Sequence, residues 1–190
     1  MNILVTGANG FIGSNICSFL EKDPNYTIFK GTRASINLYS QDCVYNYIRK
    51  NNISSIIHCA IEGGRRTIKD SESIVYNNLL MAQNLVSCPI NGVFINIASG
   101  AEFDRSQQIF NVEETELYNR VPLDYYGFSK NIIAKLTNTL SNGINLRIFG
   151  CFYHNEEITR MIRTNLCKYI NREGLIIHQD RYMDFVYIED

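Results

Sequence analysis

Short runs of β-forming residues alternate with longer segments of helical period along the first 150 residues. The runs NILVT, YTIFK, SSIIHCA, GVFINIA and INLRIF are typical of strands, and the segments between them carry apolar residues three or four positions apart. Strands that alternate with helices form parallel sheets, and right-handed crossovers place helices on both faces. The runs contain few polar residues, as expected where both faces are covered. The sequence therefore predicts an α/β fold with a doubly wound parallel sheet.

The pattern changes near residue 150, so we expect a first domain over 1–150 and the beginning of a second over 151–190. In the first, strands are expected over 2–6, 26–30, 54–60, 92–98 and 144–149, and helices over 11–22, 40–52, 71–88 and 124–141. In the second, one helix is expected over 157–172, a short strand at LIIH (175–178) and a last strand in YMDFVYIED (182–190).

Composition excludes several classes of function. The net charge of -1 offers neither a basic stripe for nucleic acid nor a polybasic patch for membranes. No apolar run approaches the roughly 18 residues of a membrane span, and the N-terminus lacks a signal peptide, so we expect a cytoplasmic protein. The six cysteines form no CxxC pair, and we expect reduced, buried thiols and no metal site.

Three glycines follow the first expected strand and open the first expected helix. Gly7, Gly10 and Gly13 lie three residues apart, a spacing that permits a tight turn, close approach of a pyrophosphate and close packing of the helix. The N-terminus of that helix would face the anion. No GxxxxGK[ST] motif is present, so the loop suits a dinucleotide better than a mononucleotide. We therefore expect the sheet to be a dinucleotide-binding Rossmann fold.

The end of the second expected strand distinguishes the two nicotinamide dinucleotides. An acidic residue there accepts the ribose 2′-hydroxyl of NAD, whereas a basic residue pairs with the 2′-phosphate of NADP. The stretch IFKGTRAS offers Lys30 and Arg33 and no carboxylate. Because arginine is the better bidentate phosphate donor, we assign Arg33 to the phosphate. NADP is the expected cofactor and NAD the alternative.

Two Tyr-x-x-x-Lys pairs occur, but only one can act as a unit. Tyr26 and Lys30 lie in an expected strand, where residues four apart are about 13 Å from each other. Tyr126 and Lys130 lie one turn apart on an expected helix. A nearby ammonium stabilises a phenolate, so Lys130 would make Tyr126 an acid–base group. Ser99 ends the fourth strand, where its hydroxyl could hold a substrate oxygen.

The chain resembles the extended short-chain dehydrogenase/reductase family of nucleotide-sugar epimerases, dehydratases and reductases. Five segments in order carry the resemblance: TGANGFIG (6–13), IIHCA (56–60), VYNNLL (75–80), INIASGAEFD (95–104) and YGFSK (126–130). The stretch from Thr32 to Gly64 is most similar to the GDP-fucose synthase subfamily, whose use of NADPH agrees with Arg33. The resemblance implies an oxidoreductase or epimerase that acts on a nucleotide sugar, in the synthesis of surface polysaccharides.

Residue roles follow from the resemblance by position. Tyr126 would be the general acid, Lys130 would lower its pKa and hold the nicotinamide ribose, Ser99 would bind the substrate carbonyl, and Asn78 would support them. His58 matches a structural position of the family. The residues expected to hold the cofactor are Gly7, Gly10, Phe11, Ile12, Gly13, Arg33, Asn37, Leu38, Ala60, Tyr126 and Lys130.

The residues after Ser99 favour simple hydride transfer. Dehydratases of this family place Asp-Glu there and GDP-fucose synthase places a cysteine two positions on, whereas this chain has Gly100 and Ala101, which cannot abstract a proton. The resemblance then implies an NADP-dependent reductase of a keto nucleotide sugar, with C4 as the expected carbonyl. The alternatives are an NAD-dependent 4-epimerase and a dinucleotide-binding sensor or scaffold that lacks catalysis.

The C-terminal segments resemble the family less closely. LRIFGCFYH (146–154) departs from the family's LRxxNVYGP, and His154, like His178, is expected to be a surface histidine. MDFVYIED (183–190) resembles RDFIYVDD, beyond which family members continue, so we expect residues 151–190 to be the truncated start of a substrate-binding region. The resemblance also implies a homodimer formed through the helix that carries Tyr126 and the helix before it.

Overall fold

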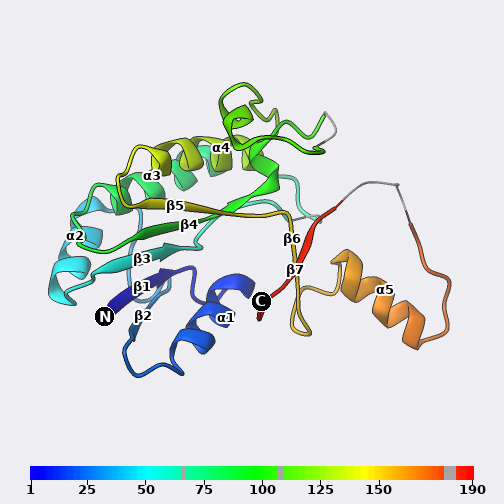
Figure 1. The fold of residues 1–190 in the computed structure, drawn as a ribbon, viewed down its shortest axis with the longest axis horizontal. Coiled ribbons are helices and arrows are strands. Elements are labelled where there is room, and N and C mark those ends of the chain that lie inside the picture. The colour runs from blue at the N-terminus through cyan, green and yellow to red at the C-terminus, as the bar shows by residue number, and fades with distance from the viewer. Residues whose placement is uncertain (66, 107–108, 178–182) are drawn as a thin grey trace. The chain divides into compact units, whose positions relative to one another are not determined.

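The computed structural model describes residues 1–65, 67–106, 109–177 and 183–190 (Figure 1). The chain divides into two compact units, Met1–Arg147 and Ile148–Asp190. Each unit is described by itself.

The first unit is built on a five-stranded sheet with the strand order β2-β1-β3-β4-β5. The pairs β1–β2, β1–β3 and β3–β4 are parallel. Strand β5 is parallel to β4. Phe94 N donates to Asn142 O, and further along both segments Asn96 Nδ2 donates to Asn145 Oδ1. The strands are β1 (Asn2–Thr6), β2 (Thr27–Gly31), β3 (Ser55–His58), β4 (Phe94–Ser99) and β5 (Gly143–Ile148).

Helices cover both faces of this sheet (Figure 1). Leu4 of β1 lies in an apolar cluster with Val44 of α2 and Leu85 of α3, whereas Ile3 lies in a second cluster with Cys17 of α1. The side chains of one strand thus alternate between two covered faces, as a doubly wound sheet requires. The predicted fold class is confirmed. The helices are α1 (Phe11–Leu20), α2 (Gln41–Lys50), α3 (Ser73–Val86) and α4 (Tyr125–Asn138).

Side-chain caps fix where two of these helices begin. Ser40 Oγ accepts the N–H of Cys43 at the start of α2, and Asp124 Oδ1 accepts the N–H of Gly127 at 2.8 Å at the start of α4. Each cap satisfies an amide that has no partner within its helix. The segment between β4 and α4 contains two short 3₁₀ helices, η1 (Gly100–Glu102) and η2 (Glu114–Tyr118).

The strand order reverses at β1, which has β2 on one side and β3 on the other. In open parallel sheets ligands bind beyond the carboxyl ends of the strands at such a reversal. The segments that leave the sheet there begin at Gly7 after β1, Thr32 after β2, and Cys59 after β3. This edge is therefore where the chemistry-bearing residues of the first unit should gather.

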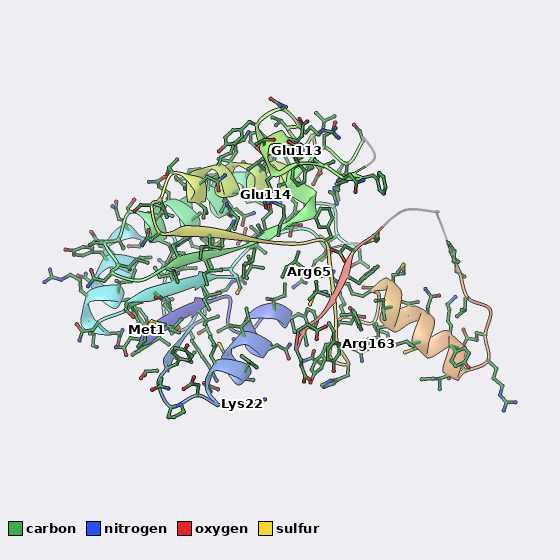
Figure 2. The ribbon with its side chains drawn as sticks, in the orientation of Figure 1. Met1, Lys22, Arg65, Glu113, Glu114 and Arg163 are labelled. Atoms are coloured by element: carbon green, nitrogen blue, oxygen red, sulfur yellow. The ribbon has the colours of Figure 1, made fainter. Side chains whose placement is uncertain are left out.

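The second unit contains a parallel pair of short strands, β6 (Gly150–Phe152) and β7 (Phe185–Tyr187), and the helix α5 (Met161–Ile170). Tyr153 donates its hydroxyl to Glu189 at 2.6 Å beside this pair. Glu156 is buried and accepts the backbone N–H of Arg163, a residue labelled in Figure 2.

Three expectations for this unit need correction. Strand β6 is not among the expected strands. It has only three residues and pairs with β7, which is distant in the sequence, so the local sequence shows no clear strand pattern. The predicted helix over 157–172 begins only at Met161, since Arg160 has an extended backbone with ψ of 144°. The predicted strand over 175–178 is wrong for residues 175–177, which are not in a strand, and His178 lies outside the described residues. Within the described ranges, no helix is long and apolar enough to cross a membrane.

Candidate functional site

The loop between β1 and α1 needs glycine at two of its three positions for close packing. Gly7 has a φ of 65°, and a methyl group built on it would lie 2.8 Å from Ala60 N. A methyl group on Gly13 would lie 2.4 Å from Gly7 O. The loop is thus pressed between the segment after β3 and the first turn of α1, which matches the roles of the first and third glycines in a dinucleotide loop.

The start of α1 fits an anionic group. The N-cap is Gly10, which is exposed and has no side chain to bond the first amides of the helix. No acidic residue lies in the first turn. Phe11 and Ile12 open the helix and are half-buried. Unpaired amides and the positive end of the helix dipole favour a phosphate. The residues present therefore fit the pyrophosphate of a dinucleotide.

Arg33 lies at the rim of this edge and faces a carboxylate that the sequence did not suggest. Its side chain is 91% exposed, and its NH2 nitrogen lies 3.9 Å from Glu62 Oε1. Glu62 also accepts hydrogen bonds from Tyr39 Oη at 2.6 Å and Asn77 Nδ2 at 2.9 Å. These two bonds, Tyr39 foremost, lower the pKa of Glu62. A 2′-phosphate on Arg33 would therefore share the guanidinium with a charged carboxylate.

Two other residues expected to hold the cofactor lie just beyond Arg33. Asn37 is exposed and its Oδ1 accepts the N–H of Tyr39 at 3.1 Å. Leu38 is buried in the main apolar cluster, and its carbonyl accepts a hydrogen bond from Asn84 Nδ2. The side chain of Leu38 therefore belongs to the core, which leaves only its backbone for a ligand.

The segment after β3 is fastened to α3 by Asn78. The amide of Asn78 accepts from Glu62 N at 2.7 Å and donates to Glu62 O at 3.0 Å and to Ser129 Oγ at 3.1 Å. Asn78 is completely buried. Both polar atoms of its amide are used in these bonds, so Asn78 links this segment to α4.

Gly63 and Gly64 carry the same segment to Tyr126. Their φ angles are 84° and 73°, in the left-handed region that favours glycine. A methyl group on Gly64 would lie 2.7 Å from Cε2 of Tyr126. Asp70 accepts the N–H of Gly64 through both carboxylate oxygens, at 3.2 and 3.0 Å. The backbone of Gly64 therefore lies against the tyrosine ring.

Helix α4 presents Tyr126 and Lys130 one turn apart, as the spacing predicted. Lys130 is 4% exposed, and its ammonium donates to Ile97 O at 2.6 Å. Ile97 lies two residues before Ser99 on β4. Burial lowers the pKa of Lys130 to about 8, against the opposing charge of Glu102. The structure thus brings α4 to the end of β4 that carries Ser99.

A buried histidine lies at the end of β3, next to Ala60. His58 Nδ1 and Thr6 Oγ1 are 2.9 Å apart, and Thr6 Oγ1 accepts the N–H of Ala60 at 3.2 Å. Burial lowers the pKa of His58 to about 3, and the charge of Lys130 acts in the same direction. His58 is therefore neutral at physiological pH and ties β1 to β3 beneath the glycine loop.

Ser99 is held by its own neighbours at the start of η1. Its backbone N–H donates to Glu102 Oε1 at 2.7 Å, and its Oγ accepts the N–H of Ala101 at 3.1 Å. The hydroxyl hydrogen takes no part in these two bonds. Sequence reasoning did not single out Glu102, although Ser followed three residues later by Glu is a recognisable capping signal.

The first unit gathers most of the predicted site residues at one edge of the sheet. The glycine loop, Arg33 and Ala60 follow β1, β2 and β3, while Ser99 ends β4 beside α4. His154 lies in the second unit, whose placement is separate. In the described parts of the chain, no group of three His, Cys, Asp or Glu side chains could hold a metal ion.

Solved structures confirm the fold. A GDP-L-fucose synthetase from Naegleria fowleri bound to NADP superposes with a TM-score of 0.76 over 98% of this chain and 64% of that one, at 16% identity. A UDP-glucuronic acid 4-epimerase from Bacillus cereus in complex with NAD gives 0.72 over 100% of this chain and 70% of that one, at 21% identity.

Sequence comparison finds similarity to enzymes whose names refer to nucleotide sugars. It is 23% identical to a GDP-6-deoxy-D-talose 4-dehydrogenase of Aggregatibacter actinomycetemcomitans, over 100% of this chain and 67% of that protein. It is 26% identical to a GDP-mannose 3,5-epimerase of Oryza sativa subsp. indica, over 81% of this chain and 46% of that protein. The chain thus spans about half to two thirds of the length of these relatives. Residues 3–190 match the sequence pattern of the NAD dependent epimerase/dehydratase family, and the chain belongs to this family.

Proposed function

We propose that the chain carries the cofactor-binding and acid–base part of an NADP-dependent reductase that acts on the keto group, at C4, of a nucleotide sugar. The observation that carries the proposal is the bond from Lys130 Nζ to Ile97 O. It holds α4, which carries Tyr126, against β4, which ends at Ser99, and this supports an acid and a hydroxyl that act together beyond the end of β4. We also assign residues 151–190 to the start of a substrate-binding region.

The three side chains would divide the proton chemistry between them. Ser99 donates its hydroxyl hydrogen to the carbonyl oxygen and orients it. Tyr126 transfers its phenolic proton to that oxygen as negative charge develops. Lys130 is mostly protonated at neutral pH, because its pKa is about 8, and its charge stabilises the resulting phenolate. A nicotinamide dinucleotide, when bound by the glycine loop, supplies the hydride.

The assignment of NADP rests on Arg33 and on the lack of a carboxylate in the segment directly after β2. Glu62 opposes it in part, since its carboxylate lies within 3.9 Å of the guanidinium. The structural relatives include an NADP-bound and an NAD-bound enzyme, so a nicotinamide dinucleotide is common to them. Our assignment of NADP rather than NAD therefore depends on Arg33.

Reduction without further proton transfers is supported by the residues after Ser99. Gly100 and Ala101 carry no acid–base group. Glu102 is the nearest carboxylate in this segment, but it is fully enclosed and its two oxygens bind Ser99 N and Arg147 Nε. It is therefore unsuited to removing a proton from C3 or C5 of a sugar.

The test is an activity assay of the full-length protein, in which NADPH and each of several 4-keto nucleotide sugars are supplied and the oxidation of NADPH is measured. We expect stoichiometric oxidation of NADPH, and Tyr126→Phe should lower kcat by at least about 100-fold while a thermal shift with NADPH persists. Tyr125→Phe is the matched control, because Tyr125 is the preceding residue on α4 and is 44% exposed.

Three results would contradict the proposal. Wild-type turnover by Tyr126→Phe would remove the tyrosine from the mechanism. Interconversion of C4 epimers without net use of NADPH would make the protein an epimerase. A larger thermal shift with NADH than with NADPH would overturn the assignment of Arg33.

A further inference from the structure

A buried ion pair lies directly behind Ser99. Glu102 has no exposed surface, and Arg147, near the end of β5, has a side chain that is 10% exposed. Glu102 Oε2 accepts from Arg147 Nε at 3.0 Å, while Oε1 accepts the backbone N–H of Ser99 at 2.7 Å. One carboxylate thus connects the last residue of β4 to β5.

The same residue also reaches the helix that carries the acid–base pair. The carbonyl of Glu102 accepts from Asn131 Nδ2 at 2.8 Å, and Asn131 directly follows Lys130 on α4. Asn131 donates as well to Leu117 O at 3.0 Å. Glu102 therefore lies where β4, β5 and α4 are joined, because its two carboxylate oxygens and its carbonyl each bond to one of them.

Stability alone is a poor reason for such a pair. Removing a carboxylate and a guanidinium from water costs several kcal/mol, and well-packed apolar residues in their place are often as stable. Burial accordingly raises the pKa of Glu102, although Ser99 N–H and Arg147 oppose the shift. What an apolar pair could not provide is an acceptor for the Ser99 amide.

The rest of the arrangement restrains Arg147. Its NH1 nitrogen also bonds to Glu114, an 83% exposed residue labelled in Figure 2. Its guanidinium carbon lies 5.7 Å from the centre of the Phe103 ring, within the range of a cation–π contact. A guanidinium held on two further sides gives Glu102 little freedom to turn away from Ser99.

We propose that Glu102 and Arg147 are positioning residues that hold Ser99 so that its hydroxyl hydrogen is directed to the substrate oxygen beside Tyr126. Glu102 fixes the backbone of Ser99, and Ala101 N–H fixes the Oγ lone pair, which leaves the hydroxyl as a donor. The inference rests on the proposed function for the identity of the substrate oxygen, but not for the restraint on Ser99.

The decisive variant replaces both charges, Glu102→Leu with Arg147→Met. Because apolar replacements of a buried pair are commonly tolerated, we expect a folded protein whose unfolding midpoint is close to that of the wild type. With NADPH and the reducible 4-keto nucleotide sugar, kcat should fall on the order of 10- to 100-fold while KM for NADPH stays unchanged. The single variant Glu102→Gln, which keeps one acceptor oxygen, should recover part of that loss.

The matched control is Glu116→Leu with Arg120→Met. That pair has the same Nε–carboxylate bond at 3.0 Å, between Glu116 of η2 and Arg120 just beyond η2, outside the Ser99 segment. Its removal should leave kcat unchanged. Equal losses from both double variants, or wild-type kcat in Glu102→Leu/Arg147→Met, would overturn the positioning role.

Amide hydrogen exchange gives a readout that needs no activity. In the wild type the Ser99 amide should be protected, and in the Glu102→Leu/Arg147→Met variant it should exchange at least about tenfold faster, with Leu4 as an unaffected reference. Unchanged exchange at Ser99 would overturn the inference. If the wild type reduces no sugar nucleotide but the exchange changes as expected, the proposed function fails and the restraint on Ser99 stands.

Discussion

Gly64 is the residue at which the segment after β3 meets the candidate acid. Its φ of 73° is unfavourable for any residue with a Cβ, and the added atom would overlap the ring of Tyr126. Asp70 holds the N–H of Gly64, so the backbone cannot retreat without breaking that bond. The ring of Tyr126 is thus set partly by a residue outside its own helix.

Gly64→Ala should therefore impair catalysis more than folding. We expect kcat to fall about tenfold or more, because a displaced ring misplaces the phenolic proton, and the free energy of unfolding to fall by at least about 1 kcal/mol. Steady-state kinetics and urea unfolding measure the two effects. Gly174→Ala is the control, since nothing lies within 4 Å of a methyl group there. Full activity in Gly64→Ala would show that Tyr126 does not depend on this contact.

The sequence revealed a pair whose two residues are close together in the chain and did not reveal pairs whose residues are far apart in the chain. Tyr126 and Lys130 act as neighbours on one helix, so their spacing was informative. Glu102 and Arg147 are 45 residues apart, and Arg33 meets Glu62 only because β2 and β3 flank β1. Local periodicity carries no signal for such pairs.

At the scale of elements, the N-terminus of α4 determines where Tyr126 lies. Asp124 is the N-cap, and Tyr126 is the second residue of the helix. Asp124 also forms an ion pair with Arg105 at 2.8 Å. Fraying of this turn would move Tyr126 before it moved Lys130, which is bonded to Ile97.

Asp124→Ala should lower the free energy of unfolding by about 1 kcal/mol and also lower kcat, whereas Asp124→Asn, which keeps a capping oxygen, should restore most of both. Ser40→Ala removes the cap of α2 and should cost similar stability with unchanged kcat. Thermal unfolding and steady-state kinetics compare the three variants. If Ser40→Ala lowers kcat as much as Asp124→Ala does, the effect is general destabilisation.

The order of elements could be predicted in the first unit because each strand and helix there has a local pattern. The expected strand over 2–6 is β1 to the residue, and the expected helix over 11–22 ends two residues beyond α1. In the second unit β6 and β7 are three residues each and depend on one another across the chain. Their stability comes from pairing and from the ring contacts of Phe152 and Tyr153 with Tyr187, which no window of sequence contains.

At the scale of the molecule, buried ionisable groups make stability depend on pH in opposite directions. His58 has a lowered pKa, so the unfolded chain binds a proton below pH 6.5 that the folded chain rejects. Glu102 has a raised pKa, so its protonation offsets part of that loss as pH falls. Lys130 affects stability at higher pH. Between pH values of about 8 and 10.5 only the unfolded chain keeps the proton of this lysine, so its contribution to stability rises with pH there.

The contribution of His58 can be isolated with His58→Asn, which keeps a short polar group for Thr6. With a folded pKa of about 3, His58 should cost about 3 kcal/mol of stability between pH 7 and pH 4. Urea unfolding of wild type and variant at both pH values gives the difference between their pH dependences, in which the carboxylates common to both chains cancel. The wild type should lose more stability than the variant over this interval. Equal losses would mean that the folded protein accepts the proton, and that His58 is not sealed beneath the glycine loop.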